Sequence, residues 1–335
     1  MRCNMNYKKY LITGGAGFIG FHLSKRLLEE GYTVVGYDNL NDYYDVEIKK
    51  NRVKELEQYE NYRFYYGDLK DYEPLEEIVK EHNIKFFINL AAQAGVRYSI
   101  THPRAYIDSN VIGMFNVLEV CRNCGVEQLL YASSSSVYGN SNEMKFREDQ
   151  MVDHPVSLYA ATKKSNELFA HVYSNNFKFN SVGLRFFTVY GPNGRPDMAY
   201  YTFTEKILNE ETIEVYNYGK QYRDFTFIDD LITSVMELIK VQGQKEVAGE
   251  YKIYNIGNGK PVMLMDFIQA LEETIGKKAK LEFTDRVVGD VDKTYADVSE
   301  LEKIIHTSPK TDIRTGLKAF YSWYEAMKTG STEHE

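Results

Sequence analysis

A tyrosine and a lysine are spaced in this sequence so that together they could move a proton. Tyr159 and Lys163 stand four residues apart in the segment YAATK, and residues at that spacing share one face of a helix. An ammonium group beside a phenol favours the phenolate, so we expect Lys163 to lower the pKa of Tyr159 from its usual value of about 10. A phenolate near neutral pH is a workable general base. By itself, a Y-x-x-x-K pattern usually marks only a surface pair.

Serines at positions 133–136 follow the strand-like segment QLLYA upstream of this pair. Polar residues at the carboxyl end of a strand in a doubly wound sheet lie at the ligand crevice. One of these hydroxyls could therefore connect a substrate oxygen to Tyr159.

A glycine-rich segment near the N-terminus is typical of a phosphate-binding turn. Gly14, Gly17 and Gly20 follow the apolar segment LIT and open a stretch with helical spacing. Glycine allows positive φ and close approach of a pyrophosphate, and the free N–H groups of the helix favour an anion. Asp38 ends the next expected strand, 24 residues after Gly14. An acid there accepts ribose hydroxyls and repels a 2′-phosphate, which predicts NAD rather than NADP. The alternative is a tight turn with a surface aspartate.

Two further strand ends could contact this cofactor. Asp68 follows the third expected strand, where it would either bind the adenine amine or cap the next helix, and both roles stay open. Leu90, Ala91 and Ala92 close another strand, and the two alanines suit close approach of a cofactor.

Strand-like and helix-like segments alternate through the first part of the chain. This alternation predicts an α/β fold with a doubly wound, parallel, Rossmann-type sheet and helices on both faces. We expect residues 1–190 to form an NAD-binding domain that carries Tyr159 and Lys163. Residues 191–335 should form a smaller domain that binds substrate and is interleaved with the first. Longer helices are predicted over residues 18–30, 74–81, 103–124, 159–177, 200–209, 265–275 and 313–327.

The composition excludes several classes of protein. The 335 residues are 43% hydrophobic and 26% charged, as in soluble globular proteins. A net charge of −8 argues against a nucleic-acid or membrane-surface partner. Three cysteines make no disulfide framework, and no apolar run approaches the ~20 residues of a membrane helix, so we expect a cytoplasmic protein. The C-x-x-C pair Cys121 and Cys124 is expected to pack a helix end, and no histidine has the spacing of a metal ligand.

The motifs together resemble those of the extended short-chain dehydrogenase/reductases, and among these the nucleotide-sugar 4-epimerases. The likeness runs through TGGAGFIG, DNL, GDL, NLAAQAGV, SNVIGMFNVLE, SSSSVYG, YAATK, LRFFTVYGP, RDFTFIDD and GDVDKTYADVS. The stretch RFFTVYGPNGRPDMA is similar to the signature of UDP-glucuronate 4-epimerases, with Asn193 where many members carry Trp. The resemblance implies a tightly held NAD, a homodimer formed by the helices near residues 111–121 and 159–175, and a role in polysaccharide biosynthesis.

The resemblance also implies roles for single residues. Tyr159 would be the base and Lys163 would bind the nicotinamide ribose. Ser134 lies 25 residues before Tyr159, the family's usual spacing for the bridging hydroxyl, although Ser135 and Ser136 stay open for that role. The implied cofactor contacts are Gly14, Gly17, Phe18, Ile19, Gly20, Asp38, Asn39, Asp68, Leu69, Leu90, Ala91, Ala92, Asn110, Tyr159, Lys163 and Phe186. The implied substrate contacts are Ser134, Ser135, Thr188, Arg195, Arg223, Arg286 and Asp290.

Three of these substrate contacts concern the nucleotide. Arg223 in YRDF matches the family's diphosphate-binding arginine, and Asp290 in GDV matches an acid that binds the uridine ribose. Many epimerases carry a second phosphate-binding arginine just before that acid, where this chain has Val287 and Val288. Whether Arg286 replaces it is open.

The implied reaction converts UDP-glucuronate to UDP-galacturonate through a transient 4-keto sugar. A uronic acid oxidised at C4 is a β-keto acid and can lose CO₂, so the carboxylate must be fixed out of alignment with the ketone. Thr188 and Arg195 could hold it with hydrogen bonds, one of them charge-assisted. The alternative role for Arg195 is a loop ion pair with an acid such as Asp197.

Other functions compete with this one. A UDP-glucose or UDP-N-acetylglucosamine 4-epimerase is the nearest alternative, and a decarboxylase or 4,6-dehydratase would use the same ketone. The dehydratases place an Asp-Glu pair where this chain has serines. A non-catalytic NAD-binding regulator is the alternative from another class, and the intact tyrosine–lysine pair argues against it.

Overall fold

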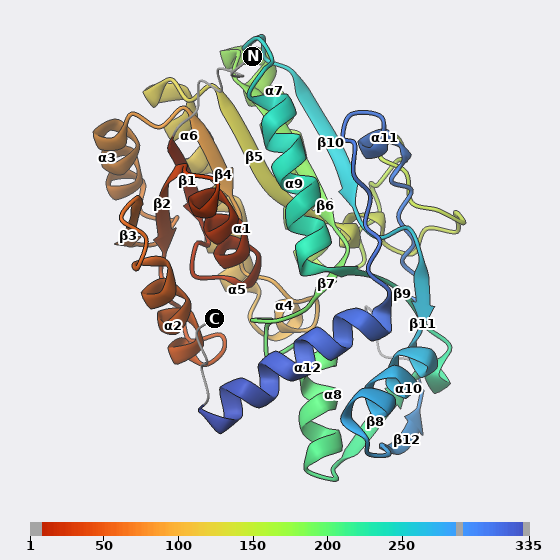
Figure 1. Cartoon of the computed structure of the whole chain (residues 1–335). Coiled ribbons are helices and arrows are strands. Elements are labelled where there is room, and N and C mark those ends of the chain that lie inside the picture. Colours follow the sequence, from red (N-terminus) through yellow and green to blue (C-terminus); the bar gives the residue numbers. More distant parts are fainter. Residues whose placement is uncertain (1–8, 286–290, 331–335) are drawn as a thin grey trace.

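A seven-stranded parallel sheet forms the centre of the computed structural model, which describes residues 9–285 and 291–330. The strand order is β10-β6-β5-β4-β1-β2-β3 (Figure 1). These strands are β1 (Lys9–Thr13), β2 (Thr33–Asp38), β3 (Tyr62–Tyr66), β4 (Phe86–Asn89), β5 (Gln128–Ser134), β6 (Asn180–Phe186) and β10 (Tyr251–Ile256). All their pairings are parallel. The doubly wound α/β fold predicted from the alternation of segments is confirmed.

Helices cover both faces of this sheet because each contributes an apolar side to one of two cores. On one face lie α1 (Phe18–Glu29), α2 (Val46–Leu56) and α9 (Ile228–Gln242), whose buried residues share one core cluster. On the other face lie α3 (Tyr72–His82), α6 (Gly113–Cys124) and α7 (Leu158–Phe177), which share a second cluster. The inner strands β1, β2, β4, β5 and β6 are largely buried on both faces, which is why they read as mainly apolar runs.

A smaller lobe lies beyond the carboxyl ends of these strands (Figure 1). It contains two small sheets, one of β7 (Thr188–Tyr190), β9 (Tyr222–Phe227) and β11 (Pro261–Met263), the other of β8 (Thr212–Tyr216) and β12 (Lys280–Thr284). Its helices are α8 (Ala199–Leu208), α10 (Leu264–Ile275) and α12 (Ile313–Thr329). In Figure 1, α12 runs across the junction between the lobe and the large sheet.

Several elements differ from the sequence-based expectation. The single helix expected over 103–124 is built from α5 (Pro103–Tyr106), a π-helical turn η1 (Ile107–Ile112) and α6. Helix α9 was not predicted. The remaining short helices are α4 (Tyr98–Thr101), η2 (Ser135–Tyr138), η3 (Asn217–Gly219) and α11 (Ser299–Glu302).

The large sheet is completed by chain that follows residue 190. Helix α9 packs on α1, and β10 pairs with β6 in register from Tyr251–Ser181 to Ile256–Phe186. The chain after residue 190 therefore contributes both a strand and a covering helix to the large sheet.

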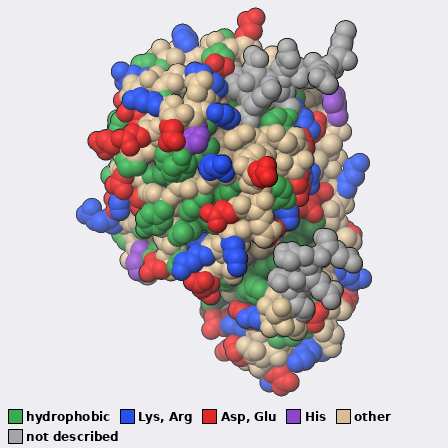
Figure 2. Space-filling view, turned by 60° about the vertical axis from the view of Figure 1, so that its left-hand side comes forward, with side chains coloured by type: hydrophobic (Ala, Val, Ile, Leu, Met, Phe, Trp, Pro, Cys, Tyr) green, Lys and Arg blue, Asp and Glu red, His purple; other side chains and the backbone are tan. Residues whose placement is uncertain are grey.

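The surface mixes both signs of charge. Figure 2 shows acidic and basic side chains interspersed on the face that it draws, so the net charge of −8 is not gathered there. Within residues 9–285 and 291–330, no helix combines the length and apolarity required to cross a membrane.

A buried ion pair fastens α7 to the sheet. The Arg185 guanidinium on β6 donates from Nε and Nη2 to the two carboxylate oxygens of Glu167 on α7, at 2.8 and 2.9 Å. Ser133 on β5 donates to the same carboxylate at 2.7 Å. Arg185 and Glu167 are each 1% exposed. Because the pair is dry and bidentate, it fixes the position of α7 over β5 and β6.

Replacing one member of this pair should destabilise the fold strongly. We expect Glu167→Gln to lower the free energy of unfolding by about 3–5 kcal/mol, because it leaves the Arg185 charge buried without a counter-charge. Urea unfolding followed by circular dichroism measures the change. Glu47→Gln, which breaks the exposed pair with Lys50, is the control and should cost less than about 1 kcal/mol. Equal losses in the two variants would contradict this interpretation.

Candidate functional site

The turn between β1 and α1 has no room for side chains at its glycines. Gly14 has φ +69°, and a Cβ there would lie 2.7 Å from the backbone nitrogen of Ala91. A Cβ on Gly17 would lie 2.9 Å from the carbonyl oxygen of Gly14, and one on Gly20 would collide with that oxygen. The turn therefore packs tightly and opens directly into α1, whose first N–H groups face an approaching anion. This geometry fits a dinucleotide pyrophosphate.

Acidic residues stand at the ends of the next two strands. Asp38 at the end of β2 is 8% exposed and accepts hydrogen bonds from the N–H groups of Ala16, at 3.2 Å, and Leu40, at 2.8 Å. Burial raises the pKa of its carboxyl group. Asp68 accepts from Asn39 Nδ2 at 3.0 Å and from Lys70 N at 3.1 Å. Asp38, Asn39 and Asp68 therefore form one polar edge beside the glycine turn.

The other residues expected to contact the cofactor frame the same edge. Phe18 and Ile19 begin α1, Phe186 ends β6, and Leu69 follows β3 with only 5% of its surface exposed. Leu90, Ala91 and Ala92 follow β4, where the Leu90 N–H donates to Thr13 O at 3.1 Å.

Asn110 is committed to contacts within the protein. Its Nδ2 donates to Gln93 O and to Thr162 Oγ1, each at 3.0 Å, and its Oδ1 accepts from Gln93 N at 2.8 Å. It is 1% exposed, on the π-helical turn. It thus links the segment after β4 to the residue before Lys163, and its role toward a cofactor stays a prediction.

Tyr159 and Ser134 meet at the first turn of α7. That helix begins after Ser157, whose hydroxyl accepts from Ala160 N at 3.1 Å. Ser134 lies close enough to the Tyr159 phenol for its side chain to lower the pKa of that phenol. Ser134 Oγ also accepts from Ser136 N at 3.1 Å, which leaves its own proton to donate to the phenol. Of the three candidate serines, Ser134 is the one that this geometry brings to Tyr159.

The pKa shifts differ from the prediction made from spacing. Burial is the largest influence on Tyr159 and raises its pKa, while Ser134 and the positive charge of Arg195 act in the opposite direction. Lys163 donates from Nζ to Ala132 O at 2.9 Å, and burial lowers its pKa to about 8. In the protein alone, the Lys163 ammonium is directed at a strand carbonyl and is not among the groups that lower the tyrosine pKa. The lowering expected from Lys163 together with a bound nicotinamide ring stays a prediction.

A cavity of about 170 Å³ is lined by Ser135 and Ser157, the sequence neighbours of Ser134 and of the first turn of α7, whereas Tyr159 and Arg195 are not among its lining residues. Four residues expected to bind substrate, or to bridge to it, line the cavity: Ser135, Ser136, Thr188 and Arg223. Sequence reasoning missed Arg97, which also lines the cavity and has its guanidinium 4.7 Å from the ring centre of Tyr216. Arg286 and Asp290 lie outside the described residues. The wall of the cavity therefore combines several hydroxyl groups with the guanidinium groups of two arginines.

Arg195 lies close enough to Tyr159 to influence its pKa, and it is paired with Asp197. Arg195 Nε donates to one carboxylate oxygen at 3.0 Å and Nη2 to the other at 2.6 Å. This is the loop ion pair that the sequence left open as an alternative. Tyr43 donates its hydroxyl to the same carboxylate at 3.1 Å. Tyr43, between β2 and α2, is half-buried beside Arg195.

Two more residues near the site were missed by sequence reasoning. The Tyr106 ring packs edge-on against Tyr159, with ring centres 6.0 Å apart. Arg52 on α2 is 2% exposed and bonded to the glycine turn. A signal for Arg52 was present, because the buried residues of α2 follow helical spacing and two of them are basic: Lys49, Arg52, Val53 and Leu56.

Comparison with known proteins places these features in a family context. Residues 10–257 match the family model described as the NAD dependent epimerase/dehydratase family. The chain is 48% identical over 328 residues to Protein CapI of Staphylococcus aureus, covering 94% of this chain and 98% of that protein. It is 42% identical over 315 residues to a UDP-glucuronate 4-epimerase of Thermodesulfobacterium geofontis, covering 94% and 95%.

A solved structure is similar in fold over the same extent. The UDP-glucuronic acid 4-epimerase of Bacillus cereus, in complex with UDP-glucuronic acid and NAD, superposes with a TM-score of 0.89 at 33% identity. The match covers 95% of this chain and 99% of that one.

The buried, charged ammonium of Lys163 should lower the free energy of unfolding. Its pKa is about 8 in the folded chain against an ordinary 10.5, so Lys163→Met should raise the free energy of unfolding by up to about 3 kcal/mol at pH 7. Between pH 8 and 10.5 the unfolded chain binds this proton more tightly, so wild-type stability rises and the advantage of methionine shrinks. Urea unfolding of the NAD-free protein at pH 7 and at about pH 10 measures both effects.

The exposed Lys54 of α2 provides the control, since Lys54→Met should leave stability unchanged to within about 0.5 kcal/mol at both pH values. An advantage of Lys163→Met that did not change with pH would contradict the assignment of a desolvated ammonium.

Proposed function

Because the chain belongs to the NAD-dependent epimerase/dehydratase family, we propose that it inverts C4 of UDP-glucuronate to give UDP-galacturonate. The observation that carries the proposal is that Ser134 and the charge of Arg195 both lie close enough to Tyr159 to lower its pKa. A phenol with a hydroxyl partner can take and return a sugar proton. A guanidinium within electrostatic reach of that phenol suits a substrate that carries a carboxylate.

NAD fits the crowded glycine turn and the polar edge of Asp38, Asn39 and Asp68 described above. Gly14, Gly17 and Gly20 would hold its pyrophosphate, and Asp38 its ribose. Bound NAD supplies reversible hydride transfer at the sugar C4, with no net consumption.

Tyr159 is the proposed acid and base. It takes the O4 proton when the sugar is oxidised and gives it back when the opposite face of the 4-keto sugar is reduced. Burial raises the pKa of the phenol in the protein alone, so added positive charge in the site would favour the phenolate. Lys163 and the oxidised nicotinamide ring are the proposed sources of that charge. Ser134 fixes the direction of the phenol oxygen and of the substrate hydroxyl.

Arg195 and Thr188 are the proposed carboxylate ligands. A sugar carboxylate would have to replace Asp197 on the Arg195 guanidinium, and Thr188 lies in the wall of the adjacent cavity. Fixing the carboxylate keeps the C5–C6 bond out of line with the ketone, and stabilises a negative charge that loss of CO₂ would remove. Arg223 is the proposed diphosphate ligand in the same cavity.

A cytoplasmic homodimer is part of the same proposal. Exposed apolar side chains are present on η1, α6 and α7: Ile107, Ile112, Phe115, Leu168, Phe169, Val172 and Phe177. Such a surface favours pairing of these helices with a second copy. The product, an activated uronic acid, suits a supply of building blocks for polysaccharides.

Product analysis tests the proposed reaction. Incubation with UDP-glucuronate, UDP-glucose or UDP-N-acetylglucosamine, followed by NMR, should show UDP-galacturonate as the main product, with no net absorbance change at 340 nm. Tyr159→Phe should retain bound NAD and lower kcat by about 10²–10⁴-fold, since it removes only the proton carrier. Full activity of this variant, or turnover of the neutral sugars alone, would overturn the proposal.

Arg195→Ala separates recognition of the carboxylate from epimerisation. We expect the KM for UDP-glucuronate to rise by about tenfold or more, or a UDP-pentose to appear as product, because a charge-assisted contact is lost. Any activity toward UDP-glucose should change by less than about twofold, which makes the neutral sugar the control. Unchanged kinetics and an unchanged product would refute the role of Arg195.

A further inference from the structure

A buried arginine joins the glycine turn to the loop that carries Arg195. Arg52 Nη1 donates to Ala16 O at 2.9 Å, and Nη2 donates to Asn193 O at 2.8 Å and Gly194 O at 3.3 Å. Ala16 lies inside the turn, while Asn193 and Gly194 come directly before Arg195. One guanidinium therefore spans the two segments on which cofactor and sugar would rest.

His22 of α1 makes a second link to the same loop. Its Nε2 lies 2.9 Å from Pro192 O, and a carbonyl oxygen only accepts, so Nε2 carries the proton. Burial lowers the pKa of His22 to about 4, which keeps the ring neutral at physiological pH. The helix that follows the glycine turn thus holds the start of the loop, while Arg52 holds its middle.

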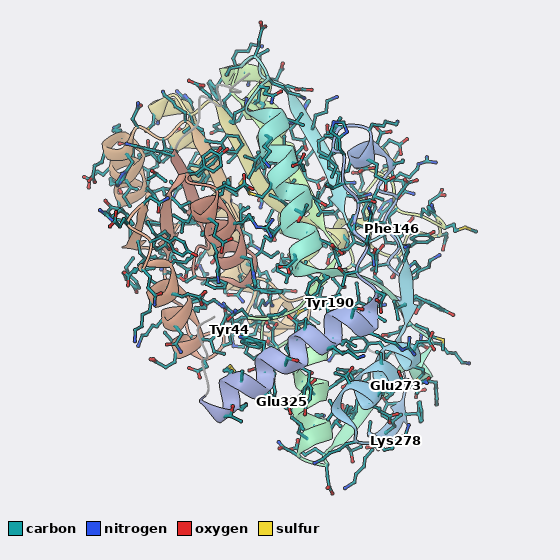
Figure 3. All side chains as sticks on the ribbon, viewed as in Figure 1. Tyr44, Phe146, Tyr190, Glu273, Lys278 and Glu325 are labelled. Atoms are coloured by element: carbon teal, nitrogen blue, oxygen red, sulfur yellow. The ribbon has the colours of Figure 1, made fainter. Side chains whose placement is uncertain are left out.

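The segment between β2 and α2 supports the far end. Arg52 Nη1 also donates to Tyr44 OH at 2.9 Å, and the neighbouring Tyr43 donates to Asp197 at 3.1 Å. Figure 3 labels Tyr44 on the side of α2 that faces the smaller lobe. The guanidinium of Arg195 lies 5.9 Å from the centre of the Tyr43 ring. Contacts from α1, α2 and this segment therefore reach the loop from Pro192 to Asp197.

The loop needs this external support because its own backbone is unfavourable. Gly191 has φ +142° and Asn193 has φ +55°, and a non-glycine residue in the left-handed region persists only when its surroundings hold it there. Asparagine tolerates that region better than a bulky residue would. The carbonyl groups that this conformation presents are the ones that Arg52 and His22 bind.

We propose that Arg52 is a positioning residue: by tying residues 193–194 to the glycine turn, it sets where Arg195 presents its guanidinium to the carboxylate of the substrate. This inference rests on the proposed function. Arginine is required because its planar fork reaches acceptors on both sides at once, whereas lysine is a single point donor. A change at Arg52 on α2 should therefore weaken the contribution of the substrate carboxylate to binding, although α2 lies outside the sugar pocket.

Arg52→Lys in the NAD-loaded protein tests the proposal while keeping the buried charge. Calorimetry should show the Kd for UDP-glucuronate rising about tenfold, with the Kd for UDP changing by less than about twofold. In turnover, the rise should appear in KM, with kcat within about threefold of the wild-type value. Lys54→Met, on the exposed face of α2, should match the wild type in every measurement. Bound NAD and the thermal midpoint are recorded for each variant.

The results of these measurements decide whether Arg52 is a positioning residue. Equal weakening of UDP and UDP-glucuronate, or no change in either, would overturn the positioning role. If Arg52→Lys cannot be obtained with NAD bound, Tyr44→Phe decides, since it removes one partner of Arg52 and should weaken UDP-glucuronate alone by about threefold. Failure of the proposed function looks different, because the wild-type protein itself would then neither bind nor epimerise UDP-glucuronate.

Discussion

The carboxylate of Glu167 holds the rest of the site in place. It receives two hydrogen bonds from Arg185 on β6 and one from Ser133 on β5, so α7 is fixed against both strands at once. Ser134, the next residue along β5, then faces Tyr159 at the start of the same helix. The nearby Lys163 is held to the backbone of β5 through Ala132. Because a proton carrier must be positioned to within a fraction of an ångström, a rigid connection between helix and strand is more useful here than extra apolar packing.

Much of the fold could be predicted because its signals are local. The apolar runs of the central strands and the helical spacing after Gly17 predicted the doubly wound sheet, and the structure confirms it. Helix α9 was not predicted, and the buried side of α2 was missed. In α2 the buried side includes Lys49 and Arg52, so the usual contrast between an apolar and a polar face is blurred. In α9 the N-terminal turn is reached directly from β9, with no side-chain cap to mark its start.

The site was less predictable, because the burial of a side chain and the direction in which it points are set only in the folded chain. Spacing placed Tyr159 and Lys163 on one helix, but not the direction of the Lys163 ammonium, which determines its effect on the phenol. The pairing of Arg195 with Asp197 could be stated only as an alternative, since either a substrate carboxylate or a neighbouring acid satisfies a guanidinium equally well. Arg52 matches no motif, because three of its four acceptors are backbone carbonyls, which every residue type supplies.

The position of β10 has a consequence for how the chain can fold. This strand forms the edge of the large sheet beside β6, yet β7, α8, β8, β9 and α9 lie between the two in the sequence. A nascent chain that ends before residue 251 would leave the hydrogen-bonding edge of β6 open to other chains. The two lobes therefore cannot mature one after the other during synthesis, and a fragment cut at residue 190 would be prone to aggregate rather than to fold as an independent dinucleotide-binding unit.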